Sequence, residues 1–174
     1  MKKLLLHICC APCGTTAVER LSAYDITLFY FNPNIHPEGE WQKRLESVQK
    51  IRYIYGLPLI APAYDTGEWY AQTAECREAP EGGARCLRCF EYRLSETCRT
   101  MDHTFDSFAT TLTVSPHKDA EKINRIGASL AHKTGKNFLE KDFKKEDGFR
   151  QSVTMSREYN LYRQKYCGCE YANQ

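Results

Sequence analysis

The placement of the cysteines constrains the fold of this chain more than any other feature of its sequence. Nine cysteines occur in 174 residues, and seven of them stand in three tight groups: Cys9, Cys10 and Cys13; Cys86 and Cys89; Cys167 and Cys169. These groups come from the beginning, the middle and the end of the chain. If they act together, the fold has to bring three distant segments to one place.

The sequence predicts a reducing, cytoplasmic setting for these thiols. The chain has no run of eighteen apolar residues, and its short apolar stretch 4–10 lacks the length and the cleavage site of a signal peptide. We therefore expect a cytoplasmic protein with no membrane partner. A reducing compartment disfavours structural disulfides, and an odd number of cysteines argues against complete pairing. Metal binding or redox chemistry is the expected role of the thiols.

The length and net charge of the chain limit the number of domains and the kind of partner that the sequence predicts. Residues 1–174 suffice for one hydrophobic core but are short for two, so we expect a single α/β domain with a cysteine-containing tail. The net charge of +2 does not by itself predict a polyanionic partner. Residues 118–165, however, contain twelve Lys or Arg against seven Asp or Glu. This excess fits either a basic face or ordinary solvated helix surfaces.

Hydrophobic periodicity predicts strands that alternate with helices. Apolar and β-branched runs predict strands at residues 3–8, 25–31, 57–61, 108–114 and 137–140. Helical spacing and terminal glycines predict helices at residues 16–21, 38–55, 66–73, 86–100, 120–132 and 148–159. This order is typical of a Rossmann-like parallel sheet with helices on both faces.

Parallel sheets bind their ligands at the carboxyl ends of the strands, and the first cysteine group follows the first predicted strand directly. We therefore expect a metal site at that edge of the sheet. The sequence contains neither GxGxxG nor the GxxxxGK[ST] phosphate loop, so nucleotide binding has no support.

The spacing of the thiols predicts two metal centres. Cys10 and Cys13, like Cys86 and Cys89, have the two-residue gap that lets both sulfurs reach one centre. Cys9 and Cys10 are adjacent, and consecutive side chains in extended backbone point to opposite sides. Seven thiolates also exceed the four that a zinc ion or a cubane cluster takes, so a division of four plus three accounts for them.

Two simpler interpretations stay open at this point. The first is a structural zinc site of four cysteines with spectator thiols, and the second is a dithiol redox enzyme that uses Cys10 and Cys13. Neither one accounts for all three groups. Cys76 and Cys98 are expected to be ordinary thiols, because Cys98 fits the apolar face of its helix and Cys76 has no near partner.

Several blocks of this sequence resemble the QueH family of epoxyqueuosine reductases. The matching blocks are HICCAPC at 7–13, YFNPNIHP at 30–37, EGGARCLRCF at 81–90, TTL at 110–112, SP at 115–116, DFKK at 142–145, GF at 148–149 and LYRQKYCGC at 161–169. They cover nearly the whole chain in order, and the last block is the most distinctive.

The resemblance implies an enzyme that reduces the epoxide of epoxyqueuosine, at the wobble position of tRNA, to the alkene of queuosine. It also implies a [4Fe–4S] cluster with an additional iron ion beside it, and an electron donor that the sequence does not identify. We assign the cluster to Cys10, Cys86, Cys89 and Cys169. We assign the second iron to Cys9, Cys13 and Cys167, with an exchange between Cys167 and Cys169 left open.

Proton donors and RNA contacts follow less directly. Five side chains near predicted strand ends could supply protons, namely Tyr30, His36, Tyr64, Asp65 and His117. Six cations are candidates for phosphate contacts, namely Lys118, Lys144, Lys145, Arg150, Arg157 and Arg163. Phe149 and Tyr162 could stack on an extruded base of the anticodon loop, although Phe149 would equally suit the core.

Overall fold

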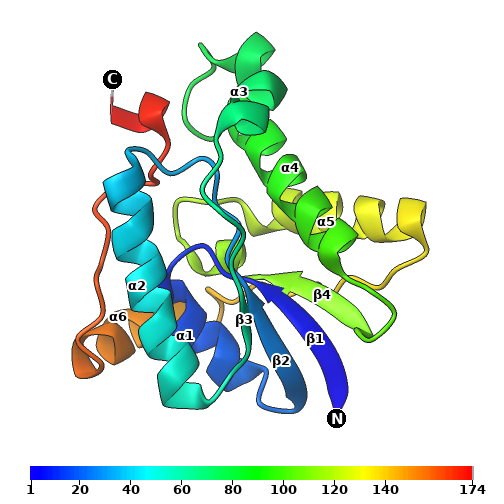
Figure 1. The fold of residues 1–174 in the computed structure, drawn as a ribbon, viewed down its shortest axis with the longest axis vertical. Helices are drawn as coiled ribbons and strands as arrows, with labels where there is room; N and C mark the ends of the chain where they lie inside the picture. Colours follow the sequence, from blue (N-terminus) through cyan, green and yellow to red (C-terminus); the bar gives the residue numbers. More distant parts are fainter. Residues whose placement is uncertain (174) are drawn as a thin grey trace.

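The computed structural model describes residues 1–173 and contains one four-stranded parallel sheet with the strand order β3-β2-β1-β4 (Figure 1). The strands are β1 (Lys2–His7), β2 (Tyr24–Phe29), β3 (Leu59–Ile60) and β4 (Ser107–Thr110). The α/β class and the parallel sheet predicted from the sequence are therefore confirmed.

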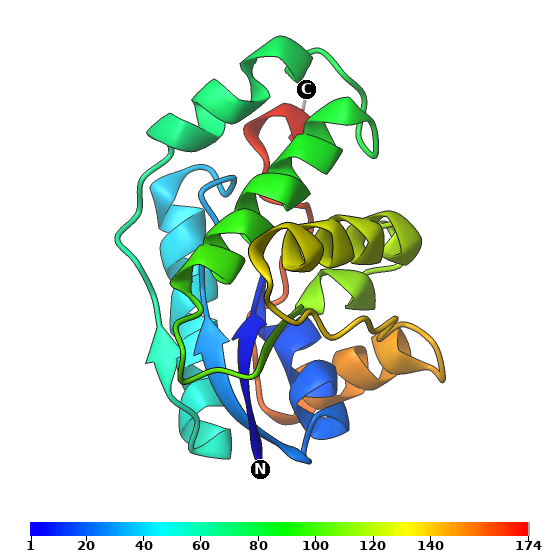
Figure 2. The same cartoon turned by 90° about the vertical axis from the view of Figure 1, so that its right-hand side faces the viewer.

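Six α-helices occur in the described residues. They are α1 (Ala11–Arg20), α2 (Glu38–Tyr55), α3 (Gly67–Thr73), α4 (Ala84–Thr100), α5 (Ala120–Thr134) and α6 (Gly148–Glu158). Three short 3-10 helices also occur there: η1 (Ala74–Cys76), η2 (Thr111–Val114) and η3 (Glu170–Asn173). Helix α1 packs against α2 and α6 on one side of the sheet, and α4 packs against α5 on the other (Figures 1 and 2).

Strand β1 shows why the sheet needs both layers. Its side chains alternate between the two faces, so Leu4 and Leu6 join the core under α1 and α2, whereas Leu5 joins the core under α4 and α5. All three leucines are fully buried. A strand covered on both faces is apolar at every position, and that is the pattern visible in the sequence at residues 4–6.

The amino-terminal helix begins earlier than the sequence predicted. Helix α1 starts at Ala11 rather than at residue 16, with Pro12 in its first turn and Cys10 as its N-cap. Proline suits this position because the first N–H groups of a helix have no intrahelical acceptor. Cys13 consequently lies in the first helical turn instead of in a preceding loop.

Two predicted strands differ from the structure. The strand expected at 108–114 stops at Thr110, whose side chain caps η2 by accepting a hydrogen bond from Leu112 N at 3.2 Å. The strand expected at 137–140 is wrong, because among the described residues only Phe138 forms an isolated bridge there, to Phe108. Packing of the Phe138 ring against the Phe108 ring holds this segment at the edge of the sheet.

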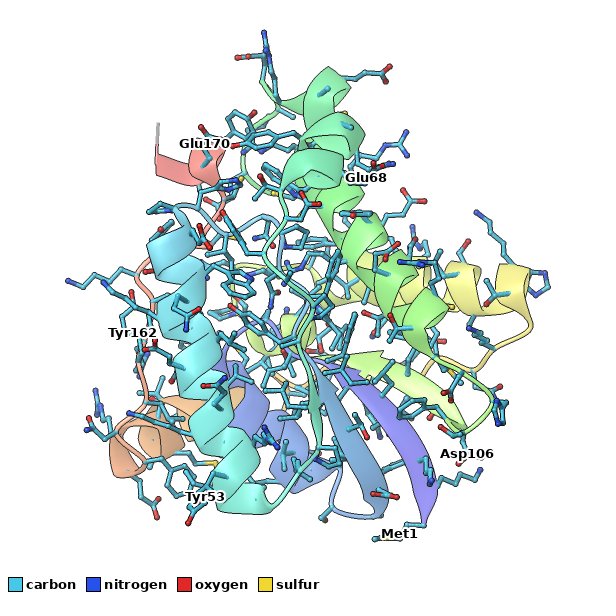
Figure 3. All side chains as sticks on the ribbon, in the orientation of Figure 1. Met1, Tyr53, Glu68, Asp106, Tyr162 and Glu170 are labelled. Atoms are coloured by element: carbon cyan, nitrogen blue, oxygen red, sulfur yellow. The ribbon has the colours of Figure 1, made fainter. Side chains whose placement is uncertain are left out.

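The carboxyl-terminal tail returns along α2 to the carboxyl ends of the strands (Figure 1). Tyr162 lies beside α2, where its hydroxyl donates to Glu40 at 2.8 Å and its N–H donates to Ser47 Oγ at 3.1 Å (Figure 3). This route carries Cys167 and Cys169 toward the other thiols. In the described part of the chain, we find no helix with the length and apolar character needed to cross a membrane.

Candidate metal centre

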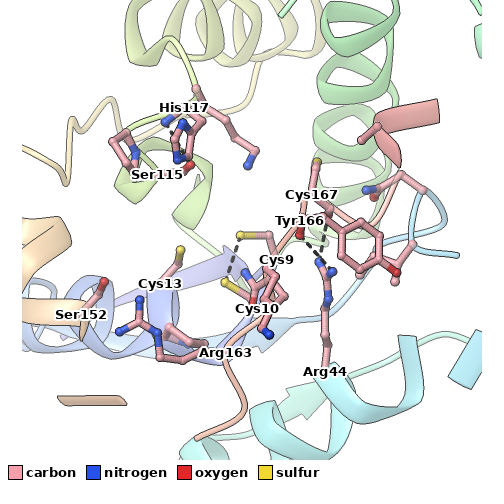
Figure 4. Close-up of a pocket in the computed structure, with 18 of the residues that line it drawn as sticks. Cys9, Cys10, Cys13, Arg44, Ser115, His117, Ser152, Arg163, Tyr166 and Cys167 are labelled. Atoms are coloured by element: carbon pink, nitrogen blue, oxygen red, sulfur yellow. Dashed lines mark hydrogen bonds between the residues drawn. The ribbon is translucent and has the colours of Figure 1, made fainter. Parts of the chain in front are cut away.

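Cys9, Cys10 and Cys13, here called the β1 thiol group, form the tightest cluster of sulfur atoms (Figure 4). Their three Sγ atoms lie within 4.8 Å of one another, and those of Cys9 and Cys10 are 3.8 Å apart. The expectation that these adjacent side chains point apart is therefore wrong. The chain bends at Cys9 where β1 has ended, and Cys10 is already the cap of α1.

Hydrogen bonds within the β1 thiol group favour one thiolate. The Cys10 and Cys13 thiols donate toward Cys9 and hold the pKa of Cys9 well below its usual value, although burial opposes this. The pKa of Cys10 rises to about 12, because the hydrogen bond to Cys9 and burial outweigh the opposing hydrogen bond to Cys13. Thr111 Oγ1 also donates to Cys9 Sγ at 3.4 Å and accepts from Cys9 N at 3.1 Å. Such an electron-rich trio suits a metal ion.

A cavity of about 450 Å³ opens beside this group. Its lining includes all three thiols of the β1 group together with Cys167 from the tail. Lys118 also lines it, and the negative charges of Cys167, Cys9 and Cys13 raise the pKa of its ammonium group although burial lowers it. The cavity therefore combines sulfur ligands with a fixed positive charge.

Cys89 and Cys169, here called the Trp69 thiol pair, lie in a separate setting. Both are buried and pack with the fully buried Trp69, and Cys167 lies at the edge of this cluster. Burial raises the pKa of Cys89, and it raises the pKa of Cys169 to about 11. This pair joins the first turns of α4 to the tail, which are 80 residues apart in the sequence.

Cys86 lies between these two settings. Its sulfur accepts a hydrogen bond from Gly82 N at 3.2 Å, at the start of α4. Cys86 and Cys9 both pack against one apolar cluster, which contains Phe90 and Leu112. The middle cysteines thus contact the surroundings of both thiol groups.

Arg44 of α2 fastens the tail that carries the last two cysteines. Its buried guanidinium donates to Glu40 at 2.7 Å, to the Cys167 carbonyl at 2.9 Å and to the Tyr166 carbonyl at 3.1 Å (Figure 4). It also lies over the Tyr166 ring at 5.3 Å. Gly168 has a φ of +101°, and a Cβ there would lie 3.0 Å from the Arg44 guanidinium. A glycine at this position allows the close approach.

Of the proton donors predicted from the sequence, only His117 lines the cavity. Tyr30 is fully buried and donates its hydroxyl to the Trp41 carbonyl at 3.0 Å, and burial raises its pKa. Asp65 is exposed and accepts a hydrogen bond from Gly67 N at 2.9 Å. Tyr64 donates to the Ile35 carbonyl at 2.8 Å. These contacts are structural.

His36 packs into an aromatic cluster outside the cavity lining. Its ring lies 5.4 Å from the Trp69 ring and 5.2 Å from the Tyr70 ring. Its Nδ1 donates to the Asn34 carbonyl at 3.0 Å, because a carbonyl can only accept. His36 therefore supports the Trp69 thiol pair rather than the cavity.

Sequence reasoning missed several polar residues of the cavity. Asn34 and Gln164 line it, and each has a buried amide oxygen without a hydrogen-bond partner. Arg93 lines it from α4 and donates to Asn32 Oδ1. Asn34 lies in the loop after β2, which ends at Phe29, so the rule that ligands bind near strand ends could have indicated it. Arg93 lies inside a helix, where no sequence rule indicated a ligand-binding position.

Comparisons with known proteins identify the family of this chain. The family model described as epoxyqueuosine reductase QueH matches residues 4–174. A relative with that name from Streptococcus pyogenes is 40% identical, with 97% of this chain and 69% of the relative covered. The Thermotoga maritima relative of the same name is 35% identical, with 99% and 91% covered, and the Haemophilus influenzae relative is 34% identical, with 98% and 71% covered. This chain belongs to the epoxyqueuosine reductase QueH family.

Proposed function

We propose that this protein reduces epoxyqueuosine in tRNA to queuosine. The observation that carries the proposal is the β1 thiol group on the wall of a cavity that also holds Cys167 and Lys118. The family name of the relatives supports the same reaction. Removing the epoxide oxygen as water consumes two electrons and two protons, so the reaction needs an outside electron donor.

The donor set fits a metal cofactor. We propose that Cys10, Cys86, Cys89 and Cys169 hold a [4Fe–4S] cluster and that Cys9, Cys13 and Cys167 hold an additional iron ion. One observation supports this division: Cys167 lines the cavity, whereas Cys169 is buried beside Cys89. Cys10 lies within 4.8 Å of both Cys9 and Cys13, so the two centres would be adjacent. When bound, such a cofactor supplies electrons and a Lewis acid for the oxirane oxygen.

The proton supply is assigned to residues that line the cavity. His117 retains the role predicted from the sequence, because its imidazole lines the cavity and can donate a hydrogen bond there. Lys118 holds a positive charge near the thiols and would stabilise the oxygen anion that forms when the epoxide opens. We do not propose Tyr30, His36 or Asp65 as proton donors, because their polar atoms make hydrogen bonds elsewhere or lie outside the cavity.

The nucleoside is held by the walls of the same cavity. Cationic side chains at its rim, Arg163 and Lys165, suit the phosphates next to the wobble nucleoside. Phe149 lines the cavity with 39% of its surface exposed and is placed to stack on a base. The unpartnered amide oxygens of Asn34 and Gln164 would accept from the N–H groups of a guanine-type base.

Anaerobic purification tests the proposal most directly. Protein prepared in this way should be brown, should contain iron and labile sulfide, and should convert the epoxide in tRNA bearing epoxyqueuosine when a strong chemical reductant is added. Colourless protein with one zinc ion would instead support a zinc-stabilised RNA-binding module. Thiol–disulfide exchange without any metal would support a dithiol oxidoreductase that uses Cys10 and Cys13. Either result would contradict the reductase.

A further inference from the structure

Four buried side-chain nitrogens in the described residues lack a hydrogen-bond partner, and all four lie around the Trp69 thiol pair. They are His36 Nε2, Trp69 Nε1, Arg85 Nε and Arg93 Nε. Buried polar groups are nearly always paired, so a concentration of unpaired ones calls for a missing acceptor. The described residues offer no oxygen within hydrogen-bond distance of these nitrogens.

Three of these nitrogens carry a hydrogen. Indole Nε1 and guanidinium Nε are donors only. His36 differs, because its Nδ1 already donates to Asn34 and its Nε2 is then a lone-pair acceptor. The ring of unsatisfied donors therefore consists of Trp69, Arg85 and Arg93.

The three donors come from α3 and α4 and lie near the sulfur atoms. Trp69 of α3 is fully buried and packs with Cys89 and Cys169. Arg93 of α4 is one helical turn beyond Cys89, and its charge and the N–H groups of Trp69 and Arg93 partly offset the burial that raises the pKa of that thiol. Arg85 lies over the Tyr171 ring at 5.1 Å, and Tyr171 in turn stacks on Trp69 at 6.0 Å.

A neutral thiol is a weak acceptor, whereas a metal-bound thiolate or an inorganic sulfide is a strong one. The donors are therefore satisfied only when the sulfur atoms beside them carry negative charge. Hydrogen bonds to cluster sulfurs stabilise the reduced, more negative state and so raise the reduction potential.

We infer that Trp69, Arg85 and Arg93 donate hydrogen bonds to the sulfur atoms of the metal centre held by Cys89 and Cys169, and that these bonds raise its reduction potential. This inference rests on the proposed function for the identity of the cluster. It assigns to the Trp69 thiol pair a preformed donor ring, of which Arg93 also lines the cavity beside the β1 thiol group whereas Trp69 and Arg85 do not.

The two tryptophans of this chain make the first test simple. In ¹⁵N-labelled, reduced, metal-free protein, the indole N–H groups of Trp41 and Trp69 give two signals, which Trp41→Phe assigns. Zinc is the probe. Binding of zinc should move the Trp69 indole proton downfield by more than the Trp41 proton, and Cys89→Ser should remove that movement. An unmoved Trp69 signal with zinc bound to the thiols would overturn the inference.

The second test measures the midpoint potential of the iron-loaded protein. Trp69→Phe keeps an aromatic ring but removes the N–H donor, so the potential should become more negative. Trp41→Phe is the matched control, because Trp41 packs on Tyr30 and Tyr64 outside the donor ring. The midpoint potential of this variant should equal that of the wild-type protein. Equal potentials in all three proteins would overturn the inference.

Neither the indole signal nor the midpoint potential depends on turnover. The proposed donor ring and the proposed reductase function can therefore be contradicted independently. A protein with the shifted indole signal and the shifted potential, but without activity on epoxyqueuosine tRNA, would retain the donor ring and lose the proposed substrate. An active reductase with unchanged potential in Trp69→Phe would retain the function and lose the donor ring. If Trp69→Phe does not bind the cluster, the zinc experiment on the wild-type protein tests whether the Trp69 indole donates to the metal-bound sulfurs.

Discussion

The β1 thiol group and the Trp69 thiol pair contain the same chemical group in opposite surroundings. The first group comes from five consecutive positions at one strand-to-helix turn and borders a cavity. The second joins α4 to the tail and is closed over by aromatic rings. A hydroxyl donor and a lysine lie beside the first group, whereas unsatisfied N–H donors surround the second.

This difference indicates a division of labour. A thiol group that borders a cavity can hold a metal that meets a substrate, because an open coordination position needs access. A buried pair with N–H donors suits a centre that stores electrons, because burial and hydrogen bonds tune its potential. The predictions below test whether this division holds.

Cysteine substitutions should have the largest effect. Cys13→Ala should lower turnover by more than about 100-fold, since even the partners of metal ligands contribute about 10–100-fold. It should keep most of the visible absorbance, whereas Cys89→Ala should lose both. Absorbance and iron content after anaerobic loading measure the contrast. Cys98→Ala is the control, because Cys98 is a buried thiol outside both groups. Equal loss of visible absorbance in Cys13→Ala and Cys89→Ala would contradict the assignment of these two thiols to different metal centres.

Arg44→Met should loosen the tail that carries Cys169 and so separate the Trp69 thiol pair, without affecting the β1 thiol group. The change leaves the Glu40 carboxylate buried without its partner, which costs on the order of 3–5 kcal/mol. Chemical denaturation measures this loss of stability, and alkylation of metal-free protein should label Cys169 faster while Cys10 keeps its rate. Arg52→Met, an exposed position on the same helix, is the control. Equal acceleration at both cysteines would show general unfolding instead.

Thr111→Val should disturb the β1 thiol group alone. The substitution keeps the shape of the side chain but removes the acceptor for Cys9 N and the donor to Cys9 Sγ. Leaving the partly buried Cys9 N–H unsatisfied costs up to about 1–3 kcal/mol. The midpoint potential of the cluster should stay nearer the wild-type value than in Trp69→Phe. A larger change of potential in Thr111→Val would reverse the proposed roles of the two groups.

Charge neutralisation at the rim of the cavity should have the smallest effect. Arg163→Gln should weaken tRNA binding modestly and lower the slope of log affinity against log salt by about 1, as expected for one lost phosphate contact. Arg77→Gln, on the exposed loop before α4, is the matched control and should leave the slope unchanged. A salt series of binding measurements checks both. Equal slopes for the two variants would place the RNA elsewhere.

Much of the fold could be predicted because its signals are local. The helix Glu38–Tyr55 was predicted with its observed bounds, since its periodicity ends at Gly56, which adopts the left-handed conformation with a φ of +64°. The predicted strand at 137–140 failed because a short apolar run does not reveal whether a neighbouring strand pairs with it. The early start of α1 was missed because Cys10 is an unusual N-cap.

The site divides in the same way. The three groups of cysteines and the position of the first one after β1 were evident, because metal-ligand spacing and strand-end placement are properties of neighbouring residues. Tyr30 and Asp65 lie outside the cavity lining, because proximity to a strand end does not determine where a side chain finds its hydrogen bond. Arg44 was missed because its role depends on contacts with a tail 122 residues away.

By itself, the sequence determined the α/β class, the family and the grouping of the cysteines, since each depends on local pattern or on matched motifs. Only the tertiary structure decided that Cys9 and Cys10 converge, that Cys169 lies beside Cys89, and that unpaired N–H donors gather around that pair. The physical reason is that burial and hydrogen bonding are set by packing between distant segments, and packing depends on all the elements at once.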